Sequence, residues 1–359
     1  MYGPATLQQV SSQTGRENST ETATASENHK LMPRKAQIEQ NVVAGLTTGR
    51  RAVVALAIGC FAAAVVHAGH QPPVPKSDWD ETWAAGRALL EGLDPYAALA
   101  SGYHFGQFNY PLVYPAPAIL VAAPFAVLPL QSALWLWAGI GTAALVWTLL
   151  ARGWWGLLGL GSAFYLHALI SVQWSPLLTA AAAVPALGFV WAAKPTIGAA
   201  LFAGWPSRAA LIGGVVLTLL SFVLVPGWVR PFLAASLAMP HTTPPVGRAG
   251  GFLLLLSFLR WRRPEARMLG VLALVPQTTL LYEMVPLLLI PRTLREMLIL
   301  VGLSLIAGAF AIQADPSHHL TAAIGTLWPV FLLLVYLPCL VLVLRRDNEL
   351  ETIQAPNEE

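Results

Sequence analysis

The feature that most constrains this chain is a succession of long apolar runs separated by short polar breaks. The first is AVVALAIGCFAAAVVHAG (52–69), the next are PAPAILVAAPFAVLP (115–129) and SALWLWAGIGTAALVWTLL (132–150), and others continue to residue 344. Hydrophobic residues make up 56% of the sequence and charged residues only 11%, which is outside the usual range of soluble domains. The sequence therefore predicts an all-α polytopic membrane protein.

Several of the later apolar runs are too short to cross a bilayer as straight helices, since a span needs about 20 apolar residues. Prolines interrupt them and give physical reasons for broken helices or half-spans; they include Pro176, Pro185, Pro195, Pro276 and Pro286. We expect about ten membrane helices, within a range of roughly nine to twelve.

Basic residues flank the apolar runs and predict the topology. Arg50 and Arg51, the RWRR stretch at 260–263, and Arg345 with Arg346 each adjoin such a run. Under the positive-inside rule these flanks are cytoplasmic, so we expect a multi-pass plasma-membrane protein with both termini in the cytoplasm. The formal charge of +3 then reflects topology, and we expect no nucleic-acid partner.

The same pattern divides the chain. Residues 1–50 are polar, without a sustained apolar period, and are expected to form a disordered cytoplasmic tail. Residues 51–345 form the transmembrane domain, and residues 346–359 a second cytoplasmic tail. Within the domain, residues 70–113 are the longest polar interruption and are expected to be the first extracytoplasmic loop.

An amphipathic helix is predicted in that loop, within KSDWDETWAAGRALLEGLDPY (76–96). Trp79, Trp83 and Leu90 recur at helical spacing on one face, and the helix is expected to end near Gly92. A helix with tryptophans on its apolar face is suited to lie along the membrane surface.

Three acids open this helix, and a structural role accounts for at least some of them. Ser77 with Asp80 fits a capping box, and Asp78 with Glu81 fits the same motif one residue later. Both frames cannot be used at once. If Ser77 is the cap, Asp78 occupies the first helical position and is free for chemistry.

Aromatic residues gather further along the loop, in YHFGQFNYPLVYPAPAI (103–119). Tyr110 and Tyr114 belong to this group. Such residues commonly form the aromatic belt at a membrane interface; the alternative is a lining for a sugar or a lipid head group.

The loop resembles glycosyltransferase family 87, whose members are polytopic, polyprenyl-phosphate-dependent mannosyltransferases of the GT-C type. The matching pieces are Asp78-Trp79, AAGRALL (84–90), GLDPY (92–96), YPAP (114–117) and Leu128-Pro129, with Gln173, Lys194-Pro195 and Tyr282-Glu283 later in the chain. Val172 stands where the family usually carries glycine, and the segment between Gln173 and Lys194 is shorter than expected for the family.

The resemblance implies a GT-C-like fold with an extracytoplasmic catalytic loop, and a hexosyltransferase activity, with mannose as the typical sugar. It implies Asp78 as general base of an inverting transfer from a polyprenyl-phosphate sugar to a lipid or glycan acceptor, within a membrane-lipid environment. Arg87 and Lys194 are the candidate donor-phosphate ligands. The candidate substrate contacts are Asp80, Tyr110, Tyr114, Gln173, Tyr282 and Glu283.

A monophosphate donor does not require a metal, so we expect no metal and no cofactor. The stretch DPSHH, with Asp315, His318 and His319, is better explained as a polar turn than as a metal cluster. A transporter or lipid flippase without bond-forming chemistry is the alternative function, because such proteins also contain short, proline-broken membrane helices.

Overall fold

A computed structural model describes residues 47–70, 77–103, 111–239, 243–278, 280–314 and 324–348, and every regular element in these ranges is a helix. The all-α prediction is confirmed for this part of the chain. The described residues 47–348 belong to one compact unit. The disordered tail predicted for 1–50 lies almost wholly outside the described residues, although the first helix already begins at Thr48.

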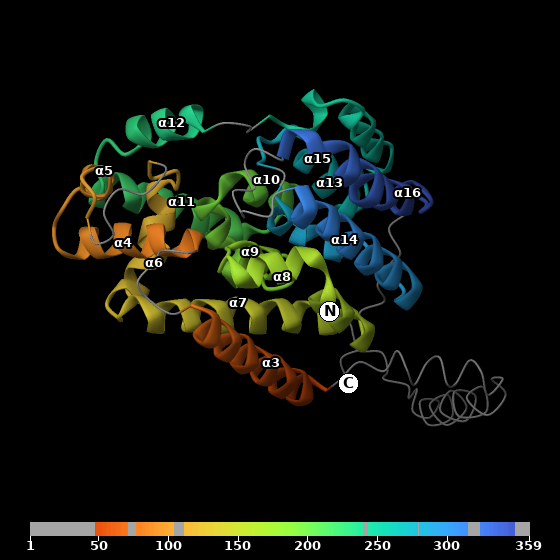
Figure 1. Ribbon diagram of the computed structural model, residues 1–359, viewed down its shortest axis with the longest axis horizontal. Helices are drawn as coiled ribbons and strands as arrows, with labels where there is room; N and C mark the ends of the chain where they lie inside the picture. Colours follow the sequence, from red (N-terminus) through yellow and green to blue (C-terminus); the bar gives the residue numbers. More distant parts are fainter. Residues whose placement is uncertain are drawn as a thin grey trace, which may run out of the picture. The chain divides into compact units, whose positions relative to one another are not determined.

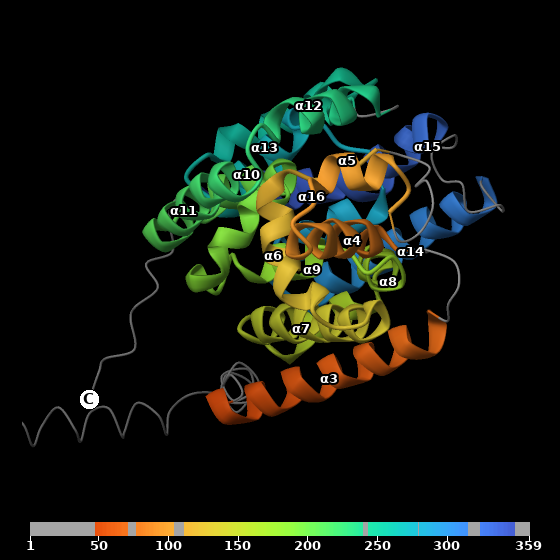
Figure 2. The same ribbon diagram turned by 90° about the vertical axis from the view of Figure 1, so that its left-hand side faces the viewer.

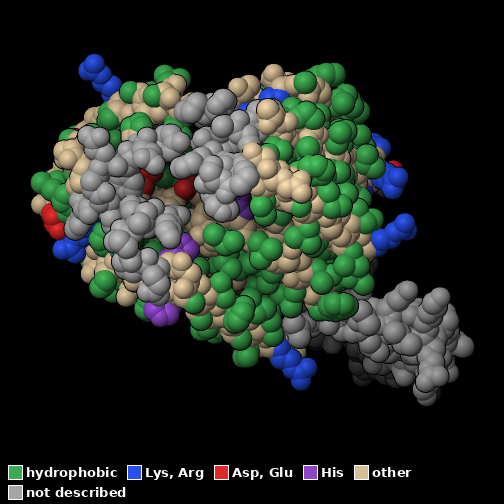
Figure 3. Space-filling model, viewed as in Figure 1, with side chains coloured by type: hydrophobic (Ala, Val, Ile, Leu, Met, Phe, Trp, Pro, Cys, Tyr) green, Lys and Arg blue, Asp and Glu red, His purple; other side chains and the backbone are tan. Residues whose placement is uncertain are grey.

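Four helical stretches are long and apolar enough to cross a membrane. They are α3 (Thr48–Gly69), α7 (Leu130–Leu150), α14 (Leu294–Ala314) and the stretch Thr326–Leu344, which runs through α15 (Ile324–Phe331), the π-helical turn η6 (Leu332–Tyr336) and α16 (Leu337–Leu344). The pair α11 (Arg208–Leu224) and α12 (Val229–Ala238) is bent by 105° and makes a fifth if it is counted as one span. Figure 3 shows hydrophobic side chains over much of the visible surface, as expected for a protein solvated by lipid.

Shorter helices fill the regions where the sequence predicted breaks (Figure 1). Several of them start at a proline, which is tolerated in a first helical turn because its missing N–H has no partner there. These elements are α4 (Asp78–Leu90), α5 (Pro95–Ala100), α6 (Ala116–Ala126), η1 (Trp154–Gly161), α8 (Ala163–Ile170), α9 (Ser175–Ala180), η2 (Pro185–Ala193), α10 (Pro195–Gly204), η3 (Pro245–Gly247), η4 (Gly251–Arg260), α13 (Pro264–Leu274) and η5 (Leu281–Leu289).

Small residues allow the first two long helices to pack closely. The buried face of α3 consists of Ala55, Gly59, Ala62 and Val66, and it lies against α7, as both ribbon views show (Figures 1 and 2). A Cβ at Gly59 would lie 2.7 Å from the carbonyl oxygen of Gly139. Membrane helices associate through such small-residue contacts because lipid supplies no hydrophobic drive between them.

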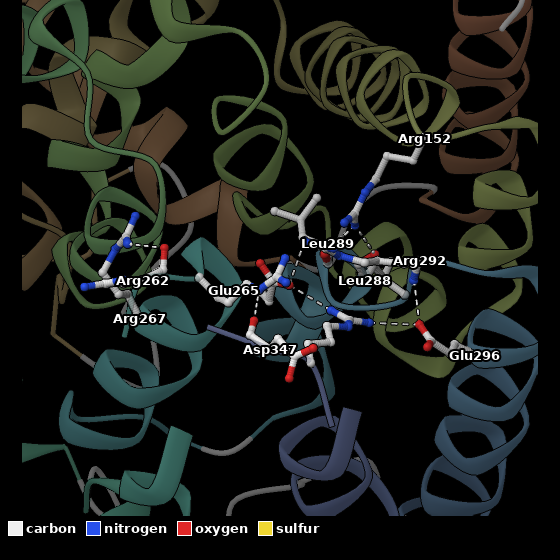
Figure 4. A network of polar contacts seen from close by, with 11 residues as sticks. Arg152, Arg262, Glu265, Arg267, Leu288, Leu289, Arg292, Glu296 and Asp347 are labelled. Atoms are coloured by element: carbon white, nitrogen blue, oxygen red, sulfur yellow. Dashed lines mark hydrogen bonds and ion pairs between the residues drawn. The ribbon is translucent and has the colours of Figure 1, made fainter. Parts of the chain in front are cut away.

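Arginine side chains hold one end of the fold together by bonding to helix carbonyls (Figure 4). The Arg51 Nε donates to the Trp147 carbonyl at 2.6 Å and so ties the start of α3 to the end of α7. Arg152, just after α7, donates to the carbonyls of Leu288 and Leu289 at the end of η5. Burial lowers the pKa of Arg152 to about 10, which still leaves it charged at neutral pH.

Glu265 and Glu296 pair with further arginines at this end of the fold, which we call the arginine end. Arg346 contacts Glu265 at 2.8 Å and Glu296 at 2.9 Å, and Arg292 contacts Glu265 at 3.1 Å. These contacts join the end of α16 to α13 and to the start of α14. The basic flanks of α3, α7, α14 and α16 therefore meet at one end of the helical body. The polar tail was predicted from residue 346, yet Arg346 is part of this network, and Arg263 also donates to the Asp347 carbonyl at 2.6 Å.

Replacing Glu265 with alanine is expected to lower the free energy of unfolding by about 3–5 kcal/mol, because it leaves partly buried arginines without their counter-charge. Glu91→Ala, which removes a similar pair from an exposed site, is the control and is expected to cost less than about 1 kcal/mol. Thermal unfolding in detergent measures both. Equal effects of the two variants would contradict the structural role of the arginine end.

The effect of Glu265 is also expected to depend on pH. Burial acts to raise the pKa of Glu265, but its backbone hydrogen bond together with Arg292 and Arg346 holds that pKa below its ordinary value. The stabilisation is therefore present above the unfolded-state pKa and is lost as the pH falls through the folded-state pKa. The difference between wild type and Glu265→Ala should shrink accordingly in acid.

Candidate functional site

The first helical turn of α4 shows which of the two predicted capping boxes forms. Ser77 is the N-cap, its hydroxyl donates to Asp80 Oδ1 at 2.6 Å, and its backbone N–H donates to Asp80 Oδ2 at 3.4 Å. The first of the two predicted frames is the one that forms. Asp80 is only 2% exposed, so it offers no surface to a substrate, and its position favours the structural role over substrate contact.

Asp78 occupies the first helical position, half-buried, and meets side chains from distant parts of the chain. Gln173 Nε2 donates to Asp78 Oδ2 at 2.5 Å. The Tyr282 hydroxyl also hydrogen-bonds to Asp78. Two donors therefore orient the carboxylate that the capping argument left free.

Lys194 brings a positive charge to the same place. Its Nζ lies 4.7 Å from the ring centroid of Tyr282 and 6.0 Å from that of Tyr114. A lysine ammonium near an aromatic face is attracted by the negative charge density of the ring. The tyrosine that bonds to Asp78 therefore also contacts the lysine.

We call Asp78, Gln173, Lys194, Tyr114 and Tyr282 the Asp78 cluster. Its members come from α4, the turn between α8 and α9, the start of α10, the residues before α6, and η5. Figure 2 shows α4 in front of α6, α8 and α9.

Aromatic packing holds α4 in this position. The Trp79 ring stacks on Trp137 of α7 with centroids 3.8 Å apart, and Trp174 lies 4.7 Å from Trp137. Trp79 is fully buried and Trp83 is 7% exposed. The prediction that these tryptophans lie on the membrane surface is wrong: their face is covered by protein, because aromatic partners from α6, α7 and the start of α9 fill the space that lipid was expected to occupy.

A close helix crossing supports the same arrangement. A Cβ at Gly86 of α4 would lie 3.1 Å from the Cα of Ala123 in α6. A side chain at this position would require α6 to shift by a few tenths of an ångström. The helix ends at Leu90, close to the predicted Gly92, and Gly92 has a left-handed φ of 77°.

The turn that carries Gln173 has an unusual backbone. Val172 has φ 46°, and it is the single non-glycine residue with a positive φ in the described ranges. The Gln173 N–H donates to the Ala168 carbonyl at 2.8 Å and closes the end of α8. A β-branched residue is rarely found in the left-handed region, and such strain concentrates at functional sites. The turn thus aims Gln173 at Asp78.

Glu81 faces the same region and was not expected to. Its Oε1 accepts the Val113 N–H at 3.3 Å, 32 residues further along the chain. Burial raises the pKa of Glu81 well above its usual range, and the neighbouring Asp78 charge adds to this shift. Sequence reasoning assigned Glu81 to starting the helix; no local pattern points to a contact this distant.

The other predicted site residues lie elsewhere. Arg87 is nine residues beyond Asp78 on one helix, which corresponds to about 13 Å along its axis. It pairs with Glu91 at 2.8 Å, so it is not part of the Asp78 cluster. Glu283 is 4% exposed and adjoins Tyr282 in sequence. Tyr110 lies outside the described residues.

His167 of α8 is a further neighbour of Tyr282. Its ring centroid lies 5.2 Å from that of Tyr282, in an edge-on geometry. This contact adds a second ring beside the tyrosine that bonds to Asp78.

The described ranges contain no group of three or more His, Cys, Asp or Glu side chains that could hold a metal ion. Residues 315–319, which include the DPSHH stretch, lie outside those ranges. Chemically, the Asp78 cluster combines an oriented carboxylate, an ammonium group and neutral hydroxyl and amide donors.

Comparisons with protein-family models, with curated proteins and with solved structures found no match to this chain.

Replacing Trp79 with alanine is expected to destabilise the protein by about 3–5 kcal/mol, the usual cost of removing a fully buried large aromatic side chain. Trp154, which is 50% exposed, provides the matched control, and Trp154→Ala is expected to change stability by about 0.5 kcal/mol or less. Thermal unfolding in detergent distinguishes the two. A small effect of Trp79→Ala would mean that α4 is not anchored by this stack.

Proposed function

We propose that this protein is a membrane glycosyltransferase that moves a hexose from a polyprenyl-phosphate donor to a lipid or glycan acceptor, with inversion at the anomeric carbon. The observation that carries the proposal is the convergence of Asp78, Gln173, Tyr282 and Lys194 from separate elements. In this set the carboxylate can act as general base and the ammonium can bind the donor phosphate. The resemblance to glycosyltransferase family 87 supports the same reaction and mannose as the sugar.

In the proposed reaction Asp78 is the general base. The acceptor hydroxyl attacks the anomeric carbon and gives its proton to the Asp78 carboxylate, while the bond from that carbon to the phosphate oxygen breaks. The leaving polyprenyl phosphate keeps the bonding electron pair. Gln173 and Tyr282 hold the carboxylate in one orientation, which lowers the entropy cost of reaching a reactive geometry.

Lys194 is the proposed ligand of the donor phosphate. A lysine ammonium binds phosphate as a point charge, and Lys194 Nζ lies 4.7 Å from the ring centroid of Tyr282, whose hydroxyl bonds to Asp78. Arg87, the other candidate cation, is engaged with Glu91 further along α4 and is assigned no role in the transfer.

The proposed topology places the chemistry on the extracytoplasmic side. The arginine end carries the basic flanks of the long helices, which the positive-inside rule assigns to the cytoplasm. The Gln131 side chain bonds to the His70 carbonyl and joins the end of α3 to the start of α7, at the opposite end from Arg51. The loop that contains α4 follows α3 there. We further propose a GT-C-like arrangement of about ten membrane elements, in which the shorter apolar helices pair to complete the count.

Asp78→Asn is expected to give a folded, membrane-inserted protein whose transfer rate falls by about 10²–10⁴-fold, the usual contribution of a general base. The measurement incubates purified protein with polyprenyl-phosphate-mannose and lipid or glycan extracts, and identifies products by mass spectrometry. Asp94→Asn is the matched control: Asp94 caps α5 through the Tyr96 and Ala97 N–H groups, and asparagine is an equally good cap.

Two outcomes would contradict this proposal. Unchanged transfer by Asp78→Asn would remove Asp78 from the base role. Movement of a lipid across proteoliposomes by the wild type, without any new glycosidic bond, would instead identify a transporter.

Lys194→Met is expected to lower the transfer rate and raise the KM for the donor, together by about 10- to 100-fold, because a hydrogen bond to a charged group is worth about 1.5–3 kcal/mol. Arg87→Met should leave both constants close to wild type. Steady-state kinetics with varied donor concentration tests the pair. A larger effect of the Arg87 change would assign the phosphate to α4 instead.

A further inference from the structure

Tyr114 is held in place by two contacts from different helices. The Tyr96 hydroxyl of α5 donates to the Tyr114 carbonyl at 2.8 Å. The Val113 N–H, directly before Tyr114, donates to Glu81 Oε1 at 3.3 Å. Both contacts grip the backbone, so they set the position of the Tyr114 ring without using its hydroxyl.

The ring that is fixed in this way takes part in the Asp78 cluster. It lies 6.0 Å from Lys194 Nζ and 6.1 Å from the ring of Trp174. Tyr114 is 5% exposed, and burial raises the pKa of its hydroxyl well above the usual range. It is therefore a neutral wall of the site, and a displacement of its backbone would move the surface beside Lys194.

Glu81 also stands one helical turn from Asp78, on the same side of α4. An anionic Glu81 would oppose the Asp78 carboxylate and any phosphate bound nearby, whereas a protonated Glu81 accepts the Val113 N–H through its carbonyl oxygen without adding charge. The two requirements, an acceptor at this point and no second negative charge, are both met by a carboxylic acid in its neutral form.

We propose that Glu81 is a positioning residue of the Asp78 cluster, which ties the backbone before Tyr114 to α4 and so holds the Tyr114 ring against Lys194. The role in transfer rests on the proposed function, whereas the tether itself does not.

The positioning role implies that phosphate binding depends on pH, through the ionisation of Glu81 and the titratable groups near it. The titratable groups that act on or respond to it are Asp78 on its own helix, Tyr96 on α5 and Tyr114. Helices α6 and α7, which pack on α4, carry no titratable side chain. Raising the pH through the Glu81 pKa should therefore ionise it and weaken phosphate binding.

The test compares Glu81→Gln with Glu81→Ala in the full-length protein. Glutamine keeps an acceptor and carries no charge, so transfer at neutral pH is expected within about threefold of wild type; alanine removes the tether, and kcat is expected to fall by about tenfold or more, in line with the loss of one hydrogen bond and its alignment. The ratio of wild type to Glu81→Gln activity should fall as the pH rises. Glu91→Gln and Glu91→Ala are the controls, because Glu91 is an exposed acid at the C-terminal end of α4.

Hydrogen–deuterium exchange at Val113 provides a measurement that is independent of activity. The amide is expected to exchange at the wild-type rate in Glu81→Gln and about 2- to 10-fold faster in Glu81→Ala, given a net hydrogen-bond contribution of about 0.5–1.5 kcal/mol. Unchanged exchange in Glu81→Ala would overturn the tether. Full activity in Glu81→Ala, or inactivity of Glu81→Gln as severe as that of Asp78→Asn, would overturn the positioning role. If the wild type transfers no sugar, the proposed function fails. The exchange measurement still shows whether Glu81 tethers the backbone at Val113.

Discussion

The stacking of Trp79 on Trp137 is the interaction on which the rest of the candidate site depends. The centroids are 3.8 Å apart, and burying two indole rings in one contact offsets much of the entropy lost in fixing a loop helix. Because Asp78 precedes Trp79, anchoring that ring also fixes the backbone that carries the carboxylate. Together with the close crossing of α4 and α6 at Gly86, this stack holds α4 where Asp78 meets Gln173 and Tyr282.

The two ends of the helical body contain different kinds of polar contact. At the arginine end, guanidinium groups donate to carbonyls that the helix ends leave unpaired, as Arg51 does for Trp147, and such groups are costly near a membrane if they have no partner. At the other end, Gln173 and Tyr282 bond to Asp78, and Lys194 lies over the rings of Tyr114 and Tyr282. A strained Val172 contributes to that arrangement. One end stabilises the fold, whereas the other brings a carboxylate and a cation to the same tyrosine, Tyr282.

Local patterns predicted much of the architecture. The apolar runs identified the long helices, the Ser77–Asp80 spacing identified the cap of α4, and elimination among three acids left Asp78 as the residue that now meets Gln173. The helices and the cap depend on residues that are close in the sequence, so local patterns could predict them. The lipid-facing position of Trp79 and Trp83 was a wrong prediction, because an apolar helix face suits a bilayer and a protein neighbour equally well.

The contacts that span the chain could not be predicted in the same way. Arg87 is close to Asp78 in sequence but lies further along a rigid helix, whereas Gln173 and Lys194 are distant in sequence and enter the cluster. The Glu81 contact with Val113 depends on how the chain returns after residue 110, and no spacing rule encodes that return. Tertiary packing, not residue type, decided which charges meet.

A structure determined with polyprenyl phosphate bound would test the central claim most directly, because it locates the leaving group without relying on turnover. The account predicts the phosphate within about 3 Å of Lys194 Nζ, the usual length of a charge-assisted hydrogen bond, with the Asp78 carboxylate facing the space that the sugar would occupy. A phosphate bound at Arg87, or among the arginines at the opposite end, would contradict it.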